Sequence, residues 1–293
     1  MGALERRQGF LAVTVCYTIW GILPIFWKLF SGLDSFYILS HRCLWSFVFC
    51  LPLITLTKRW GDVRAVFRDR RKLLLTLAAG ALVGFNWGTY IFAVGNAYIV
   101  EASLGYYINP LLISALGFLL FQERFNKFEL WALGLAVAAV LYFAIRLSVV
   151  PWISLAIALS FGFYGAVKKL SGVESSVSMT VETMLLAPIA LVMLTLFEIG
   201  GNGAIGNVPG WEMAILPLAG ICTLVPMLLY GYGVKRLDYS ICGMLLYINP
   251  TLQLLLGILL YGEDFTITHG ITFTLIWISV ILFLVGQRKK TNK

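Results

Sequence analysis

Long apolar stretches alternate along this chain with short polar segments. Ten stretches run for about 20 residues each, which is the length a helix needs to cross the roughly 30 Å hydrocarbon core of a bilayer. They are continuous rather than alternating, which excludes the strands of a β-barrel. The predicted fold class is therefore an all-α polytopic membrane protein. Its ten transmembrane helices are expected at residues 9–30, 36–56, 73–96, 101–121, 127–146, 151–170, 177–198, 211–233, 239–260 and 267–286.

The chain also contains an internal duplication. Residues 107–125 (YINPLLISALGFLLFQERF) and 247–265 (YINPTLQLLLGILLYGEDF) are 140 positions apart and agree at 11 of 19 positions. A shift of 140 places the first five spans on the last five, and an odd number per half makes the second half cross the membrane in the opposite direction. We expect two five-helix inverted-topology repeats, residues 1–148 and 149–293, packed as one integral membrane unit.

Composition and charge place the chain in a membrane and orient it. Hydrophobic residues make up 60% of the sequence, charged residues 12%, and the mean hydropathy is +0.88, so the chain is far more apolar than a soluble domain, of which roughly 45–50% is apolar. Nineteen of the 22 Lys and Arg residues fall at span ends on one face. The positive-inside rule then predicts a multi-pass protein of the cell (inner, cytoplasmic) membrane with both termini in the cytoplasm. It also explains the basic run 58–72, so no nucleic-acid partner is expected.

The repeated Asn-Pro pairs, 109–110 and 249–250, fall roughly 12–16 Å into their spans, near the midplane. A proline inside a helix removes one backbone hydrogen bond, so Pro110 and Pro250 are predicted hinges. The alternative is that each pair is only a kink, with the Asn satisfying the broken turn. The polar side chains at this level are expected to face a central cavity: Tyr107, Asn109, Tyr247 and Asn249.

Ionisable residues inside the spans are the next candidates. Arg42 and Glu182 are 140 positions apart and should flank the midplane from opposite sides, where an unpaired charge costs several kcal/mol. We predict substrate or gate roles for both, against the alternative of structural ion pairs or snorkelling. His41 and Glu182 are candidates for a proton relay, although a packed histidine is the alternative. Lys168, at a span end, is expected to snorkel.

Further polar and aromatic residues are assigned to the cavity wall on their position within the spans. Asn86 and Tyr90 share one helix face at a spacing of four. The remaining candidates are Trp20, Tyr164 and Tyr230. For any single aromatic side chain, ordinary helix packing or an interfacial aromatic belt is the competing interpretation.

Several strings resemble a known family. They are the pattern of Trp20, Gly21 and Lys28 in the first span, HRCLWSF (41–47), GFNWGTYIFAV (84–94), EASLGYYINPL (101–111) and SFGFYGAVKK (160–169). Together they are similar to the EamA branch of the drug/metabolite transporter superfamily, and within it to the RarD-type permeases, over essentially the full chain. The resemblance implies an inner-membrane permease whose cavity is lined mainly by spans 1, 3, 4, 6, 8 and 9. It implies no particular substrate.

The sequence thus predicts a secondary transporter, expected to export a small metabolite or drug-like solute by alternating access. Its partners would be that solute and the lipid bilayer, with protons as a candidate coupling ion. No cofactor or metal site is expected, and the oligomeric state is not indicated. The chain has no H-E-x-x-H or G-x-S-x-G motif, so enzymatic catalysis is not expected. The alternatives are a non-transporting membrane sensor or scaffold and, less favoured, an intramembrane enzyme.

Overall fold

Helices account for the regular structure of the chain. The computed structural model describes residues 2–95, 99–147, 152–261 and 266–291, and no strand occurs within these ranges. Ten helices of the described residues are long and apolar enough to span a membrane, which confirms the ten predicted spans. The expected boundary between the halves, at residues 148 and 149, lies outside the described residues.

In the first half, four spans are single helices and the first is composite, because α1 ends at Ile22 and Pro24 starts a new helix after the intervening Leu23. The elements are α1 (Ala3–Ile22), α2 (Pro24–Trp27), the 3₁₀ turn η1 (Lys28–Phe30), α3 (Ser35–Leu56), α4 (Trp60–Arg68), α5 (Arg70–Gly95), α6 (Ile99–Phe121) and α7 (Lys127–Leu147). The short helix α4 lies within the basic run 58–72 and was not predicted.

In the second half, the eighth and ninth spans are each divided into two helices. The elements are α8 (Trp152–Ser171), α9 (Ser175–Ile199), α10 (Gly210–Ile215), α11 (Leu218–Val234), α12 (Tyr239–Leu245), α13 (Ile248–Tyr261) and α14 (Ile267–Thr291). The 140-residue correspondence extends to the helix caps. Asp34 accepts the Phe36 N–H at the start of α3, and Glu174 accepts the Ser176 N–H at the start of α9.

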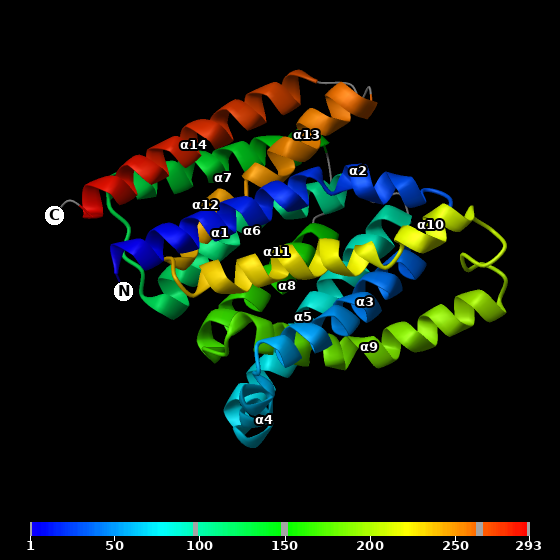
Figure 1. Cartoon of the computed structure of the whole chain (residues 1–293). Coiled ribbons are helices and arrows are strands. Elements are labelled where there is room, and N and C mark those ends of the chain that lie inside the picture. The colour runs from blue at the N-terminus through cyan, green and yellow to red at the C-terminus, as the bar shows by residue number, and fades with distance from the viewer. Residues whose placement is uncertain (1, 96–98, 148–151, 262–265, 292–293) are drawn as a thin grey trace.

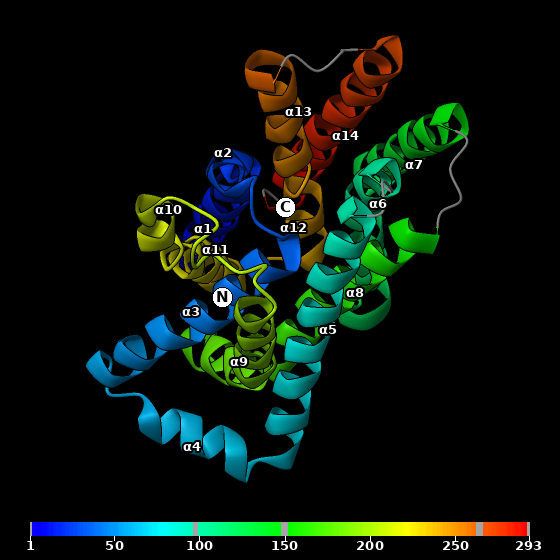
Figure 2. The same cartoon turned by 90° about the vertical axis from the view of Figure 1, so that its right-hand side faces the viewer.

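The two halves pack as inverted repeats around one centre. Corresponding helices pair with each other, α7 along α14 and α3 along α9, while α6 packs on α8 as α1 packs on α13 (Figures 1 and 2). Both chain termini lie at the same end of the bundle (Figure 1). We call this end the terminal face and the other end the opposite face.

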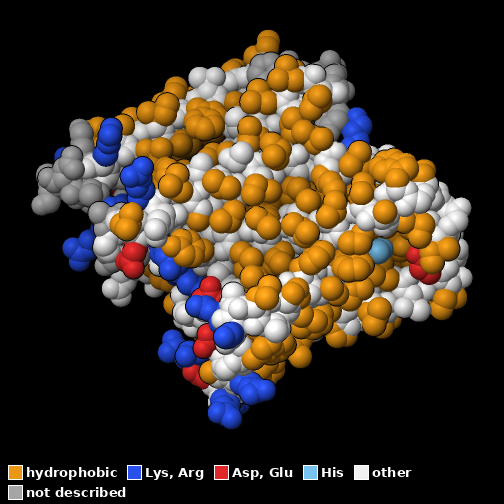
Figure 3. Space-filling model, viewed as in Figure 1, with side chains coloured by type: hydrophobic (Ala, Val, Ile, Leu, Met, Phe, Trp, Pro, Cys, Tyr) orange, Lys and Arg blue, Asp and Glu red, His pale blue; other side chains and the backbone are white. Residues whose placement is uncertain are grey.

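Surface chemistry follows the same axis. Lys and Arg side chains gather at the terminal face and around α4, whereas the middle of the molecule is covered by hydrophobic side chains (Figure 3). Large apolar residues are widely exposed along the membrane-spanning helices, among them Leu56 at 82%, Trp131 at 77% and Ile145 at 75%. An apolar belt of this extent fits contact with lipid tails rather than water.

The two copies of the repeated motif meet where α6 crosses the ninth span. The hydroxyl of Tyr247 donates to the carbonyl oxygen of Tyr107 at 3.2 Å. The crossing is close because position 243 is glycine: a Cβ there would lie 2.7 Å from the Pro110 carbonyl oxygen. Helix α6 continues through Pro110, whereas the ninth span is interrupted at residues 246–247, just before Pro250. The motif is therefore repeated in sequence but not in backbone conformation.

Candidate functional site

A cavity of about 240 Å³ opens between the two halves. Six residues assigned to the cavity wall from the sequence do line it: Trp20, Arg42, Asn86, Tyr90, Asn109 and Asn249. The other lining residues were not assigned from the sequence, and they include four aromatic side chains and one amide: Trp27, Trp87, Tyr106, Phe161 and Gln253. The lining comes from spans 1, 2, 3, 4, 6 and 9. The resemblance implied a lining by the eighth span, but the second span lines the cavity instead. The eighth span contributes Thr223, which accepts a hydrogen bond from Arg42 but does not line the cavity.

The missed lining residues were detectable from spacing. Gln253 is one turn from Asn249, Tyr106 is three residues from Asn109, and Trp27 is seven residues from Trp20. Residues three, four or seven apart share a helix face. A cavity wall drawn from those periods would have included all three.

The cavity extends towards the opposite face. Its lining reaches Trp27, at the end of α2, and Ser35, the first residue of α3, both at that end of the bundle (Figure 1). At its inner end lie Trp20 and Phe161, whose rings meet edge to face at 5.6 Å.

Arg42 is the charged residue of the cavity wall. Its Nε donates to Thr223 Oγ1 at 3.1 Å, and its guanidinium carbon lies 4.8 Å from the ring of Trp27 and 5.0 Å from that of Trp87. Two aromatic faces stabilise the cation without neutralising it. Within the described ranges no carboxylate pairs with Arg42, and no protein acceptor takes the hydrogens of its terminal nitrogens. The cavity therefore presents an uncompensated positive charge with a free hydrogen-bonding fork.

Amide side chains provide the neutral polar groups. Asn109 is 1% exposed, and its Oδ1 has no hydrogen-bond partner. The Oδ1 of Asn249 accepts from Gln253 Nε2 at 2.9 Å. Asn86 instead holds α5 against α8, donating to the Ile157 carbonyl at 2.9 Å. A buried amide oxygen without a partner is rare in proteins, so Asn109 is the neutral group best placed to meet a ligand.

Aromatic rings supply most of the remaining wall. Tyr90 and Tyr106 lie 5.8 Å apart at 66°, and they line the same cavity as the Trp27 and Trp87 rings that flank Arg42. Rings of this kind offer flat apolar surface to a ligand, while a few polar groups fix its orientation. The combination is that of a small-molecule site.

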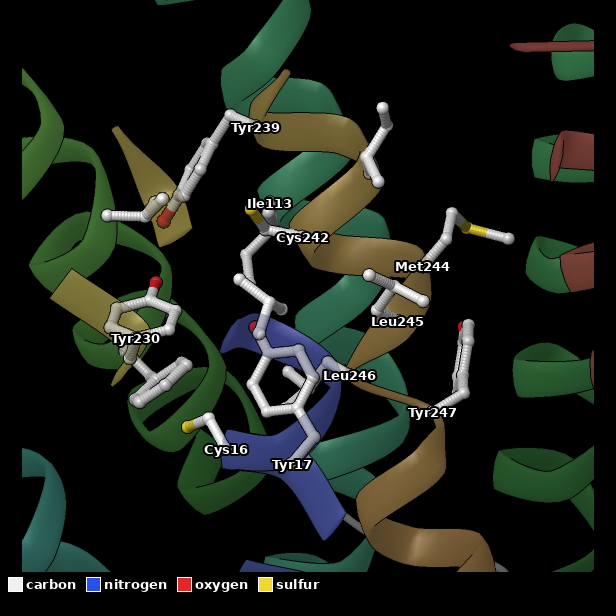
Figure 4. Packing of buried hydrophobic residues seen from close by; sticks show 14 of the residues in the cluster. Cys16, Tyr17, Ile113, Tyr230, Tyr239, Cys242, Met244, Leu245, Leu246 and Tyr247 are labelled. Atoms are coloured by element: carbon white, nitrogen blue, oxygen red, sulfur yellow. The ribbon is translucent and has the colours of Figure 1, made fainter. Parts of the chain in front are cut away.

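A cluster of tyrosines closes the bundle below the cavity, on the side of the terminal face. Tyr164 and Tyr230 stack at 5.9 Å and 17°, and Trp20 at the cavity floor lies 6.1 Å from Tyr230. The Tyr239 hydroxyl donates to the Gly162 carbonyl at 2.5 Å. Tyr230 and Tyr239 reach α8 from α11 and α12 (Figure 4). We call the four fully buried residues of this cluster the tyrosine seal: Tyr17, Tyr164, Tyr230 and Tyr239.

Several tyrosines that the sequence analysis assigned to the cavity wall lie elsewhere in the structure. Tyr164 and Tyr230, assigned to the cavity wall, lie beneath its floor and do not line it. Tyr247, between α12 and α13, donates to the Tyr107 carbonyl and does not line the cavity. Tyr107 packs on Phe143 at 4.9 Å and on Phe273 at 5.6 Å, so it joins α6 to the α7–α14 pair, whereas Asn109 and Asn249 line the cavity.

A buried ion pair lies beside the seal. Lys168 Nζ is 2.7 Å from Glu182 Oε1, and the two side chains are 0% and 1% exposed. The Tyr164 hydroxyl donates to Glu182 Oε2 at 3.1 Å, and Ser178 donates to the same carboxylate. The prediction that Lys168 snorkels is wrong. Glu182 supplies its partner inside the bundle, and the neighbouring Lys169, which is partly buried, donates to the Leu237 carbonyl.

The remaining ionisable candidate, His41, lies apart from this pair. Its Nδ1 accepts from Trp45 Nε1 at 3.1 Å, and its ring packs edge-on against Tyr37 at 4.7 Å. It does not line the cavity. The structure therefore does not bring His41 into the cavity beside Arg42, and it does not bring His41 to Glu182. A proton relay through His41 and Glu182 stays a prediction.

Contacts between the halves complete the closure at the terminal face. The carboxylate of Glu123, just after α6, accepts the backbone N–H groups of Tyr239 and Ser240, the latter at 3.0 Å. It thus caps the start of α12, where a negative charge is favoured by the helix dipole. Arg6 of α1 lies 3.8 Å from Asp238 next to the same helix start.

Comparison with known proteins agrees with this architecture. The model of the EamA-like transporter family matches twice, over residues 7–145 and 148–285. The uncharacterized transporter YojE of Bacillus subtilis is 39% identical, over 97% of this chain and 96% of its own length. Protein RarD of Escherichia coli is 36% identical over 100% of both chains.

A solved crystal structure has the same fold. It superimposes with a TM-score of 0.75 at 19% identity, over 97% of this chain and 99% of its own length. The double family match and the full-length relatives show a membrane transporter built from two repeats. The chain belongs to the EamA-like transporter family, as a RarD-type permease.

Proposed function

We propose that this transporter exports a small organic anion carrying a flat apolar group, and that it does so by alternating access. The observation that carries the proposal is Arg42: a guanidinium in the wall of a central cavity with no carboxylate partner among the described residues. A charge within a membrane protein is costly and is retained where it serves a pathway.

The chemistry of the cavity supports the class of solute. A carboxylate can accept two parallel N–H bonds from a guanidinium, which is stronger and more directional than a neutral contact. The rings of Trp27, Trp87 and Tyr106 would then cover an aromatic or planar part, and the unpartnered amide of Asn109 would meet a hydrogen-bonding substituent. A volume of about 240 Å³ suits a metabolite rather than a peptide.

The orientation and direction are part of the proposal. The concentration of Lys and Arg at the terminal face supports a cytoplasmic location for that face and for both termini. The present conformation would then be open to the outside and closed to the cytoplasm. Export requires the reverse conformation, in which solute enters from the cytoplasm.

Inverted repeats give a physical route to that reverse conformation. Because the halves are related by an axis in the membrane plane, an exchange of their two conformations converts an outward opening into an inward one. The tyrosine seal and the Glu123 cap would separate in that exchange, and the Lys168–Glu182 pair beside them would become hydrated. We propose Glu182 as the group that can then take up a proton and couple export to the proton gradient.

A binding experiment tests the class of solute. Purified protein is heated with a panel of aromatic carboxylates and, as matched controls, the neutral amides of the same compounds. A ligand at 100 times its Kd stabilises the folded state by about 2.7 kcal/mol, so the carboxylates should raise the melting temperature and the amides should not. Arg42→Gln should abolish the shift, whereas Arg146→Gln, an exposed cation outside the cavity, should retain it. Equal shifts with acids and amides would reject the proposal.

A further inference from the structure

Helix α4 departs from the pattern of the other helices. It is only nine residues long, and it joins α3 to α5 at the lower edge of the molecule as drawn in Figures 1 and 2. One of its faces is anchored: Val63 and Val66 are 5% and 3% exposed and belong to an apolar cluster with Val177 of α9. Trp60 and Phe67, in contrast, are 40% and 47% exposed.

An apolar groove of about 300 Å³ separates α4 from the bundle. Trp60 and Phe67 form its α4 side, Leu51 belongs to α3, and Met184 belongs to α9. Arg64 is the only charged residue in the lining. The groove therefore combines an apolar trough with one cation at its edge, which matches an amphiphile rather than a polar solute.

The surrounding charge favours an anionic occupant. Residues 58–72 contain seven basic and two acidic residues. Arg59 is 2.8 Å from Glu174, and Lys72 is 3.6 Å from Asp69, so these two cations are compensated. In the described part of the chain no carboxylate lies within ion-pair distance of the others, which are Lys58, Arg64, Arg68, Arg70 and Arg71.

We propose that this groove binds one anionic phospholipid from the leaflet at the terminal face. An acyl chain would lie between Trp60, Leu51 and Met184, and the phosphate would meet Arg64 at the level of the helix ends, where headgroups are found. Clustered cations next to a membrane-spanning helix attract anionic lipids in this way, and an exposed tryptophan is favoured at the same depth.

The lipid site is separate from the transport cavity. Met184 is two residues from Glu182, which places it on nearly the opposite side of α9, since successive residues turn by about 100°. The two cavities share no lining residue. Lipid binding can therefore be measured whether or not the proposed solute is correct.

Native mass spectrometry of delipidated protein tests the site, with phosphatidylglycerol and phosphatidylcholine as the added lipids. Wild-type protein should bind one phosphatidylglycerol in clear preference to phosphatidylcholine. Arg64→Gln should weaken phosphatidylglycerol binding about fivefold, the effect of one basic residue near an anionic headgroup. Met184→Trp, which fills the trough, should weaken both lipids.

The control is Arg7→Gln, which removes an exposed cation at the terminal face but outside the groove, and should leave binding unchanged. Circular dichroism melting confirms that each variant is folded. Equal weakening by Arg64→Gln and Arg7→Gln would mean diffuse surface attraction, and equal wild-type binding of both lipids would mean an unspecific apolar groove. Either result overturns the proposal.

Discussion

Replacing Lys168 with Met should destabilise the folded protein by about 3 kcal/mol, because it leaves a buried carboxylate without its counter-ion. The pair is fully buried, so water cannot replace the lost partner. The Tyr164 hydroxyl and Ser178 still donate to Glu182 in this variant. The loss should therefore fall at the lower end of the roughly 3–5 kcal/mol typical of a broken buried pair.

The reciprocal variant Glu182→Gln should lower the free energy of unfolding further, by about 5 kcal/mol. It removes the carboxylate that pairs with Lys168 and leaves the ammonium 5.2 Å from the Tyr164 ring. The double variant replaces both charges by neutral groups of similar size, and such replacements of a buried pair are often close to neutral in stability. It should recover most of the loss, to within about 1–2 kcal/mol of wild type.

The assay is chemical unfolding of all four proteins in the same detergent micelles, followed by tryptophan fluorescence and far-ultraviolet circular dichroism. The free energies form a double-mutant cycle, whose coupling term should be several kcal/mol. Single variants as stable as wild type, or a double variant that loses the sum of the two single losses, would refute the pairing of Lys168 with Glu182.

Four further variants test the closure and the repeated motif. Gly165→Ala places a methyl group against the hydroxyls of Tyr230 and Tyr239 and should lower the free energy of unfolding by about 1–3 kcal/mol. Gly32→Ala, which has open space around it, should leave the thermal unfolding temperature unchanged. Glu123→Gln weakens the cap of α12 and should increase the alkylation rate of buried Cys242 in an otherwise cysteine-free protein; an unchanged rate would count against the cap. Asn109→Ala and Asn249→Ala should slow solute flux without reducing membrane insertion, and wild-type flux in both would exclude a role of the motif in cycling.

The sequence was sufficient for the membrane fold because length and apolar continuity are local properties. Each span needs about 20 apolar residues, and the runs ending at Leu56 and Phe121 end where the helices do. The helix α4 was missed because its nine residues alternate charge with apolar positions inside a loop already explained by topology. Amphipathic helices of that length carry too little apolar signal for a hydropathy argument.

The direction of a side chain around its helix was not predictable from the sequence. The 140-residue shift predicts mirror depths for Arg42 and Glu182, yet it cannot show that Glu182 turns to Lys168, only 14 residues earlier, rather than to the cavity. Tyr90 and Tyr230 likewise occupy equivalent positions, and one lines the cavity while the other closes it. Because the two halves have different conformations in this structure, sequence symmetry cannot show which of two equivalent residues lines the cavity and which belongs to the tyrosine seal.

The central claim, an anion held by Arg42 in a transport cavity, is tested most directly by flux into proteoliposomes. The carboxylate and amide pairs of the binding panel are supplied outside, and uptake is measured for wild type, Arg42→Gln and the control Arg146→Gln. Wild type and the control should move the carboxylate and not the amide, and Arg42→Gln should lose at least about tenfold, as expected for a lost charged hydrogen bond. Undiminished carboxylate flux in Arg42→Gln would contradict the account.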